Sequence, residues 1–281
     1  MHFAKLQALG NDFIVIASED ASESALATLS RELCDRHFGV GADGLLLCRR
    51  TSTGGMPNFH MRVFNADGGE AELSGNGLRC LAAYVCRQGW MEGNELTIDT
   101  LGGRKTLRLV RTAGTEYWFE VDMGKPILDP AQIAFRPRTH PLSLIGYLLV
   151  IDGKAYPVTV TSMGNPHCSL FLDTFEDFDW ERLGRQIETH AYFPQRTNVE
   201  FIQVTDDSSA TVRFWERGVG KTFSSGTGSC AALVACVLGG FTGRDLRITT
   251  LGGDMELSWL SDQSIRLKGP AKFICEGEYA P

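Results

Sequence analysis

The sequence predicts an α+β protein built from two similar domains, and three observations lead to this prediction. Residues 64–86, FNADGGEAELSGNGLRCLAAYVC, return in altered form at residues 215–236 as WERGVGKTFSSGTGSCAALVAC. The chain has 281 residues, which is enough for two domains that each bury a core. Short β-rich runs separated by turn signals flank both copies and suffice for a mixed or antiparallel sheet in each half. A repeat of about 150 residues is typical of a duplicated domain and not of a solenoid.

The two copies share one local plan. In each, a β-rich run and a glycine-bearing turn lead into an S-G-x-G motif that opens an apolar helix. Ser74 and Ser225 occupy the same place in this plan and lie 151 positions apart. The tetrapeptide Thr-Leu-Gly-Gly at residues 100–103 returns at residues 250–253, so the repeat continues beyond the helix.

The domain boundaries follow from composition. The first domain is predicted to end near Gly124 and so to cover residues 1–124. Residues 126–141 hold four of the ten prolines and are the expected linker. The second domain is predicted over residues 125–269, and a return of residues 270–281 to the first domain is left open.

Hydrophobic spacing and turn residues predict the other elements. Leu26 and Leu33 fall at helical spacing, with Gly39 closing the helix. The segments 78–85 and 230–238 are interpreted as helices that are apolar all round, so they are expected in the centre of their domains. The remaining predicted elements are a helix at 180–189 and strands at 59–65, 95–100, 106–110, 116–121, 147–151, 156–161, 198–204, 210–215, 246–250, 255–259 and 265–267.

Composition and charge exclude several classes of protein. The net charge is −7 and no run of like charge occurs, so a small molecule is the expected partner and nucleic acid is not. The sequence has neither a signal-peptide pattern nor an apolar run long enough to span a bilayer, so the expected location is the cytoplasm. The eight cysteines form no CxxC pair and mostly lie in apolar runs, which favours buried free thiols over disulfides or zinc ligands. Neither a metal nor a cofactor is expected.

The repeated S-G-x-G motifs have a chemistry of their own. Glycines at a helix start let backbone N–H groups point at a bound anion, and the helix dipole favours negative charge there. If the two helix ends faced each other, one carboxylate could be held by both, with Ser74 and Ser225 on opposite sides of the neighbouring carbon. That geometry suits the movement of a proton across a stereocentre. A simpler interpretation makes both motifs glycine-rich helix caps with N-cap serines, and the duplication weighs against it.

The repeated loops, NADGGEAELSGNGLRC and ERGVGKTFSSGTGSC, resemble the two signature loops of the diaminopimelate epimerase family. The segments KLQALGNDFIVI, GVGADGLLL, SMGNPHC and RTNVEF are also similar to that family's segments and stand in the same order. The resemblance implies two pseudo-symmetric domains, each a curved sheet wrapped around a central helix, with the active site in the cleft between them. It also implies a cofactor-independent 1,1-proton transfer that interconverts LL- and meso-diaminopimelate for lysine and peptidoglycan synthesis, usually in a homodimer.

The sequence departs from the family at the two acid/base positions, which carry cysteine in the family and are Ser74 and Ser225 here. A thiol titrates near about 8.5, and a helix N-terminus lowers this further, whereas a hydroxyl gives up its proton far less readily. Each acid or base group is worth about 10²- to 10⁴-fold, so the chain is expected to be inactive or strongly impaired. Cys80 and Cys230 are not expected to substitute, because helical spacing carries them into the core. An engineered Cys→Ser pair and a natural variant both remain open.

The resemblance assigns the other site residues by position. Backbone N–H groups of Gly75, Asn76, Gly226 and Thr227 match those that hold the carboxylate beside the reacting carbon. Arg217 is expected to bind the carboxylate at the far end of the substrate. The further matching positions are Asn65, Asn165, Asn198 and Glu216 for the far ammonium group, Asn11 as another contact, Gly44 where some members carry glutamine, and His167 with Glu216 as residues that tune the acid/base pair.

Each assignment has a structural alternative. Asn11 and Asn198 can be turn residues, Glu216 and Arg217 an exposed ion pair, and His167 a packed core histidine. Lys221 stands where the family often has an acid, and the sequence offers no explanation for it.

Two functions stay open beside an impaired epimerase. One is a non-catalytic amino-acid-binding protein that kept the pocket, and another is an isomerase of another substrate, such as those with the related folds of proline racemases and the phenazine-biosynthesis isomerase. A triad hydrolase is disfavoured because neither Ser74 nor Ser225 lies in a G-x-S-x-G motif.

Overall fold

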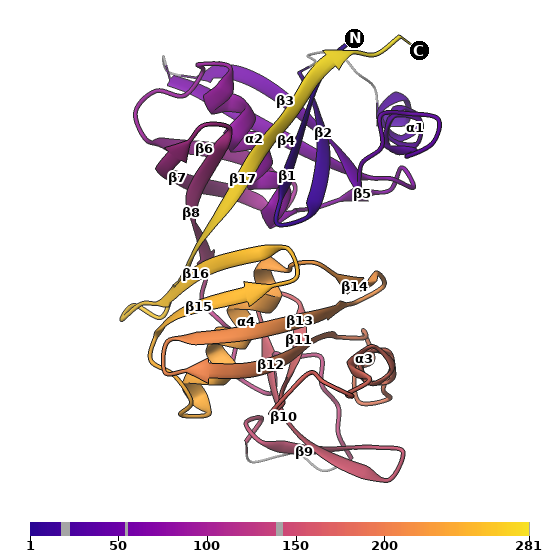
Figure 1. Ribbon diagram of the computed structural model, residues 1–281, viewed down its shortest axis with the longest axis vertical. Helices are drawn as coiled ribbons and strands as arrows, with labels where there is room; N and C mark the ends of the chain where they lie inside the picture. Colours follow the sequence, from indigo (N-terminus) through magenta and orange to yellow (C-terminus); the bar gives the residue numbers. More distant parts are fainter. Residues whose placement is uncertain (18–22, 54–55, 139–142, 281) are drawn as a thin grey trace. The chain divides into compact units, whose positions relative to one another are not determined.

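The computed structural model describes residues 1–17, 23–53, 56–138 and 143–280 (Figure 1). The chain divides into two compact units. Unit 1 consists of Met1–Val121 and Lys268–Pro281, and unit 2 consists of Asp122–Leu267. Both units combine sheet and helix, which confirms the predicted α+β class. In the described residues, no helix combines the length and apolar character needed to cross a membrane.

Unit 1 is a mixed sheet with two helices. The pairings β1–β2, β3–β4 and β6–β7–β8 are antiparallel, and β2–β3 and β4–β6 are parallel. The last strand, β17, pairs with both β1 and β8 and so closes the sheet into a ring. The elements are β1 (His2–Ala8), β2 (Asn11–Ala17), α1 (Glu23–Cys34), β3 (Gly44–Thr53), β4 (Met56–Asn65), β5 (Glu70–Ala71), α2 (Gly75–Arg87), β6 (Glu95–Thr100), β7 (Gly103–Ala113), β8 (Glu116–Gly124) and β17 (Ile265–Glu278).

Unit 2 repeats this plan pair by pair. The antiparallel pairings β10–β11, β12–β13, β13–β14 and β15–β16 and the parallel pairings β11–β12 and β13–β15 follow the order of those in unit 1. The elements are β9 (Tyr147–Ile151), β10 (Lys154–Ser162), β11 (Pro166–Phe171), α3 (Trp180–Glu188), β12 (Asn198–Asp206), β13 (Ser209–Glu216), β14 (Gly220–Thr222), α4 (Gly226–Leu238), β15 (Asp245–Thr250) and β16 (Gly253–Trp259).

The repeat extends to single hydrogen bonds around the Thr-Leu-Gly-Gly turns. Gly102 N donates to Glu72 O at 2.9 Å, and Gly252 N donates to Phe223 O at 3.0 Å. In each turn the threonine hydroxyl also donates to the carbonyl of the second glycine, at 2.7 Å in unit 1 and 2.8 Å in unit 2. Each turn therefore tethers the chain two residues before the serine that begins the next helix.

The helices α2 and α4 are largely buried within their units. Residues 228–236 of α4 are all buried, and residues 230–236 are all apolar. This is expected for a helix with no face toward solvent. Residues 76–85 of α2 are also buried, but they include Arg79, which is 1% exposed. The interpretation of α2 as apolar all round is therefore wrong at this position.

Most predicted elements are confirmed, with three differences. The strand predicted at 265–267 begins β17, which continues to Glu278 because its later residues pair with β1. The expected linker is not a free connector, since Ile133 and Phe135 are buried in the core of unit 2. Residues 139–142 of that segment lie outside the described residues. The helix α1 ends at Cys34, before Gly39, which instead lies against the last carbonyls of α1, where a Cβ would approach Glu32 O to 2.1 Å.

The cysteines are free thiols throughout the described residues. Six are buried, Cys86 is half-buried and Cys275 is exposed on β17. Burial thus holds for most of them, and Cys275 lies beyond the register shift in the β1–β17 pairing, where the alternation of buried and exposed residues along β17 ends.

Candidate active site

Ser74 and Ser225 cap α2 and α4 with nearly the same geometry. Ser74 has φ −135° and ψ 120°, and its Oγ accepts a hydrogen bond from Gly77 N at 3.0 Å. Ser225 has φ −140° and ψ 125°, and its Oγ accepts from Gly228 N at 3.3 Å. Both serines are therefore N-caps, as in the simpler interpretation that the duplication had weighed against. Each hydroxyl lies at the positive end of a helix dipole, where negative charge is favoured.

The two glycines of each S-G-x-G motif have different reasons to be glycine. A Cβ on Gly77 would lie 3.1 Å from Ser74 Cβ, and one on Gly228 would lie 2.9 Å from a ring carbon of Phe214. Packing therefore excludes a side chain at the second glycine. A Cβ on Gly75 would meet nothing within 4 Å, and one on Gly226 would make only ordinary contacts at 3.7 Å or more. The first glycine leaves open space beside the backbone.

That space borders backbone donors. The first N–H groups of an α-helix have no acceptor within the helix. Across the described ranges, the N–H groups of Gly75, Gly226 and Thr227 donate to no other group. An anion could approach them without displacing an existing hydrogen bond.

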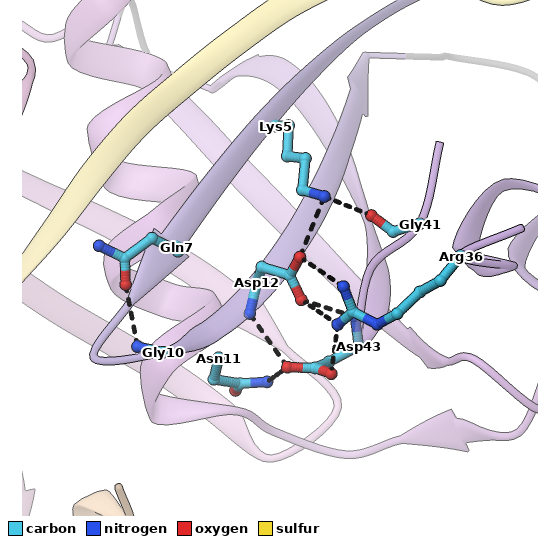
Figure 2. A network of polar contacts seen from close by, with 8 residues as sticks. All are labelled: Lys5, Gln7, Gly10, Asn11, Asp12, Arg36, Gly41 and Asp43. Carbon is cyan, nitrogen blue, oxygen red and sulfur yellow. Dashed lines mark hydrogen bonds and ion pairs between the residues drawn. The ribbon is translucent and has the colours of Figure 1, made fainter. Parts of the chain in front are cut away.

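Asn11 is held by a charged network at the start of β2 (Figure 2). Its Nδ2 donates to Asp43 Oδ2 at 2.8 Å, and Asp43 N donates to Asp12 Oδ1 at 3.0 Å. Arg36 bridges both carboxylates at 2.7 and 2.9 Å, and Lys5 lies 3.1 Å from Asp12 Oδ2. Although burial opposes ionisation of Asp12, hydrogen bonds and charges from Arg36 and Lys5 outweigh it and lower its pKa. Asn11 is therefore a positioned side chain.

The side chain of Asn76 continues this network into α2. Its Nδ2 donates to Asn11 Oδ1 at 3.3 Å, and its Oδ1 accepts a short hydrogen bond from Arg79 Nη2. The structure thus brings together Asn11 and Asn76, which the sequence places 65 positions apart.

Ser225 also contacts a carboxylate in unit 2. Its Oγ donates to Glu216 Oε2 at 3.1 Å. Burial raises the pKa of Glu216, and the Ser225 hydrogen bond and the charge of His167 offset this only in part. The alternative of an exposed Glu216–Arg217 ion pair is not what the structure contains, because Glu216 turns to Ser225 while Arg217 is exposed and donates to Gln195 O at 3.2 Å.

His167 forms a buried pair with Glu200, a residue that the sequence analysis missed. His167 Nδ1 lies 2.7 Å from Glu200 Oε1, and His167 Nε2 lies 3.0 Å from Asn165 Oδ1. Ser169 Oγ donates to the other Glu200 oxygen at 3.0 Å. Each carboxylate oxygen of Glu200 therefore has a side-chain hydrogen-bond partner, as a buried carboxylate requires. The only signal in the sequence is a charged residue inside the apolar strand run NVEFIQV.

The other asparagines are occupied by contacts within their own units. Asn198 Nδ2 donates to Pro166 O and its Oδ1 accepts from Arg217 N, both at 3.0 Å. The side chain of Asn198 therefore fixes the loop that carries Arg217. In unit 1, the carbonyl of Asn65 already accepts from Ser30 Oγ at 2.8 Å and from Gly68 N at 2.9 Å.

Gly44 lies at the start of β3 without room for a side chain. A Cβ there would lie 2.8 Å from Phe64 O and 3.2 Å from the ring of Phe13. This backbone therefore cannot place a glutamine at the position where some family members carry one.

The structure explains Lys221, for which the sequence offered no account. Its Nζ lies 2.7 Å from Glu181 Oε1 on α3, and both side chains are about half exposed. The same loop is anchored by Glu188, whose Oε2 accepts from Trp215 Nε1 at 2.7 Å and whose Oε1 accepts from Gly218 N at 2.8 Å. Contacts from α3 thus fix both ends of the turn after β13.

The nearest cysteines in sequence do not replace the missing thiols. Cys80 and Cys230 are fully buried, and burial raises the pKa of Cys80 to about 12 and that of Cys230 further still. Neither thiol can form a thiolate near neutral pH in this setting.

The fold is shared with a class of isomerases and related proteins. A phenazine biosynthesis protein of the PhzF family from Bacillus anthracis aligns with a TM-score of 0.69 at 16% identity, covering 100% of this chain and 99% of that one. A predicted epimerase from Pseudomonas aeruginosa aligns with a TM-score of 0.67 at 19% identity, over 100% and 99% of the two chains. A probable proline racemase from Agrobacterium radiobacter gives 0.67 at 13% identity, over 99% and 92%.

Sequence similarity narrows this class to one family. The family model for diaminopimelate epimerase matches residues 3–128 and 159–274. Proteins named diaminopimelate epimerase from Desulfitobacterium hafniense and Pelotomaculum thermopropionicum are 41% and 40% identical, each over 99% of this chain and over 97% and 99% of their own lengths. One from Methanococcus maripaludis is 39% identical over 99% of both chains. The chain belongs to the diaminopimelate epimerase family, a family of isomerases.

Proposed function

We propose that the chain has the binding site of an epimerase that moves the α-proton of LL- or meso-diaminopimelate, with both proton-transfer positions silenced by serine. The observation that carries this proposal is the matched pair of caps, in which Ser74 and Ser225 begin two helices with the same geometry and border open backbone donors. Moving a proton from one face of a carbon to the other needs two groups, and the duplicated fold supplies two equivalent positions.

The substrate roles follow from the chemistry of each position. The N–H groups of Gly75, Asn76, Gly226 and Thr227 would bind the carboxylate beside the reacting carbon. The exposed Arg217 would bind the far carboxylate, since its guanidinium can make a bidentate contact. Asn11 supplies a further polar contact. The carbonyls of Asn165 and Asn198 and the carboxylate of Glu216 remain candidates for the far ammonium group.

In unit 2, Glu216 lies within hydrogen-bond reach of the side chain at position 225, and its raised pKa makes it a better base than an ordinary carboxylate. The Ser225 hydroxyl remains the obstacle to proton transfer, because it does not ionise readily. A thiol in the same place would ionise far more readily. His167 would act through its charge on Glu216.

The deciding experiment measures deuterium incorporation from solvent at the α-carbon of LL-diaminopimelate. The parent chain is compared with Ser74→Cys/Ser225→Cys, with both single cysteine variants and with Ser74→Ala/Ser225→Ala. We expect exchange with epimerisation only in the dithiol variant. The alanine pair should match the parent, because neither has a group that ionises.

A second candidate function is an amino-acid-binding protein without catalysis, favoured by the loss of both thiols while the open space beside Gly75 is kept. If the dithiol variant binds the amino acid but exchanges no proton, this candidate or an isomerase of another substrate replaces the first. We further propose a homodimer, which light scattering on the purified protein would test.

A further inference from the structure

Arg79 is a buried cation one helical turn from Ser74. It is 1% exposed, and its three hydrogen bonds reach neutral oxygens, namely Pro270 O at 3.2 Å, Gly75 O at 3.3 Å and Asn76 Oδ1. No carboxylate contacts it within the part of the chain that the structure describes. Buried charges are normally paired, so a guanidinium with only neutral partners lacks its counter-charge.

The charge persists at neutral pH. Burial lowers the pKa of Arg79 to about 10, which still leaves the side chain protonated. Its Nη1 bonds to the carbonyl of Gly75, the first residue of α2, so the charge lies directly behind the open space at that glycine. The helix dipole and the guanidinium therefore favour an anion at the same end of α2.

The equivalent helix of unit 2 has no such cation. The residue that matches Arg79 at the spacing of 151 positions is Cys230. The start of α4 instead lies beside carboxylates, because Ser225 Oγ bonds to Glu216 and a Cβ on Gly228 would lie 3.1 Å from Glu200 Oε1. The two helix ends therefore differ in charge: a buried cation lies at the start of α2, and the buried Glu200 and the half-buried Glu216 lie at the start of α4.

Arg79 also fixes the direction of two amides. A guanidinium only donates, so Asn76 must turn its Oδ1 toward Arg79 and its Nδ2 toward Asn11. Asn11 in turn must direct its Oδ1 to Asn76 and its Nδ2 to Asp43. Arg79 at one end and the Asp43 carboxylate at the other therefore set the donor and acceptor pattern of both asparagines.

We propose that Arg79 is a positioning residue whose positive charge, behind Gly75, attracts a ligand carboxylate to the start of α2. Unit 1 then contributes most of the affinity for that carboxylate. The inference rests on the proposed function only in taking an amino acid as the ligand. A purely structural role, holding β17 to α2 through Pro270 O, is the alternative to be tested.

The test compares Arg79→Gln and Arg79→Lys by calorimetric titration with LL-diaminopimelate, using the parent chain, which should bind without turnover. Glutamine keeps a donor for Asn76 but removes the charge, whereas lysine keeps the charge. We expect Arg79→Gln to weaken binding at least about tenfold and Arg79→Lys to stay within about threefold. Arg104→Gln, which removes an exposed charge of unit 1, should leave the affinity unchanged. Equal affinities in the parent and Arg79→Gln, or equal losses in both Arg79 variants, would overturn the proposal.

Asn76→Asp tests the same idea without removing Arg79. It places a carboxylate of the same shape beside the guanidinium and so supplies a counter-charge from within the chain. We expect the variant to fold at least as stably as the parent and to bind the ligand at least about tenfold more weakly. This variant decides the question if Arg79→Gln fails to fold, and unchanged binding by a folded Asn76→Asp would contradict the proposal.

A nuclear magnetic resonance titration separates this inference from the proposed function. The backbone amide of Gly75 is followed while LL-diaminopimelate and then L-alanine are added to ¹⁵N-labelled protein. A shift with L-alanine but not with diaminopimelate, lost in Arg79→Gln, would refute the proposed substrate and support the carboxylate site. A Gly75 amide that responds to neither compound would refute the site itself.

Discussion

Glu200 and His167 form a buried polar pair in unit 2, and each residue depends on the other for a hydrogen-bond partner. Both lie in strands whose other residues are mostly apolar, and they are 1% and 0% exposed. A charge at such a position costs several kcal/mol unless it is paired. The pair therefore explains why a carboxylate can occupy a buried position in β12.

Breaking this pair should destabilise unit 2 strongly. We expect Glu200→Gln to lower the free energy of unfolding by about 1–3 kcal/mol, because His167 and Ser169 lose the buried charged acceptor that they share. Urea unfolding measures the loss. Glu181→Gln, which breaks the exposed ion pair with Lys221, should change the same quantity by no more than about 1 kcal/mol. Similar losses in both variants would show that burial does not strengthen the inner pair.

Glu216 should make stability depend on pH in the opposite sense to a surface carboxylate with a cationic partner. Its pKa is raised in the folded state, so its contribution is fully present below the pKa of the unfolded chain and is lost as pH rises through the folded value. We expect Glu216→Gln to raise the melting temperature more at pH 7 than at pH 4. Glu92→Gln, at an exposed position, is the control. An equal gain at both pH values would contradict the assignment of a buried, reluctantly ionised carboxylate.

At the scale of the element, the two S-G-x-G caps were predictable because their chemistry is local. An N-cap serine and a glycine turn act through residues three positions away, so the motif alone predicts them. Local patterns also predicted the strand at 95–100, which the structure reproduces as β6.

What could not be predicted depends on distant partners. Arg79 was counted within an apolar run, and although Gly75 and Asn76 lie within the same helix, its third acceptor, Pro270 O, comes from the other end of the chain. The length of β17 was missed for the same reason, since its pairing with β1 is not visible in its own sequence. Glu200 was missed because its partner lies on the neighbouring strand.

The two glycines of the cap on α4 should respond oppositely to alanine. We expect Gly228→Ala to destabilise the protein by about 1–3 kcal/mol, since its Cβ would meet Phe214 and Glu200. Gly226→Ala should alter stability by less than about 1 kcal/mol but weaken ligand binding, because its methyl group would enter the space beside the open N–H groups. Chemical unfolding and calorimetric titration of both variants make the comparison. Loss of stability in Gly226→Ala would mean that packing, and not a ligand, requires this glycine.

At the scale of the whole molecule, unit 1 is assembled from two separate parts of the chain. Its last strand is supplied by residues 268–278, after the whole of unit 2. A chain that ends at Leu267 lacks the strand between β1 and β8. We expect limited proteolysis of that chain to cut within residues 1–121 while residues 122–267 resist, and a chain that ends at Tyr279 to resist throughout. Equal resistance of both units in the shorter chain would show that β17 is dispensable.

The pairing of β1 with β17 also sets the order in which the protein can be completed on the ribosome. Domains generally fold from the N-terminus onward as they are synthesised. Here β1 emerges before unit 2 but meets its partner only after residues 272–278 have left the exit tunnel, by which point all of unit 2 has emerged. The nascent chain therefore carries an unpaired strand edge for most of its translation, and such edges are prone to aggregate. Synthesis of unit 1 thus begins before that of unit 2, but unit 1 is completed after it.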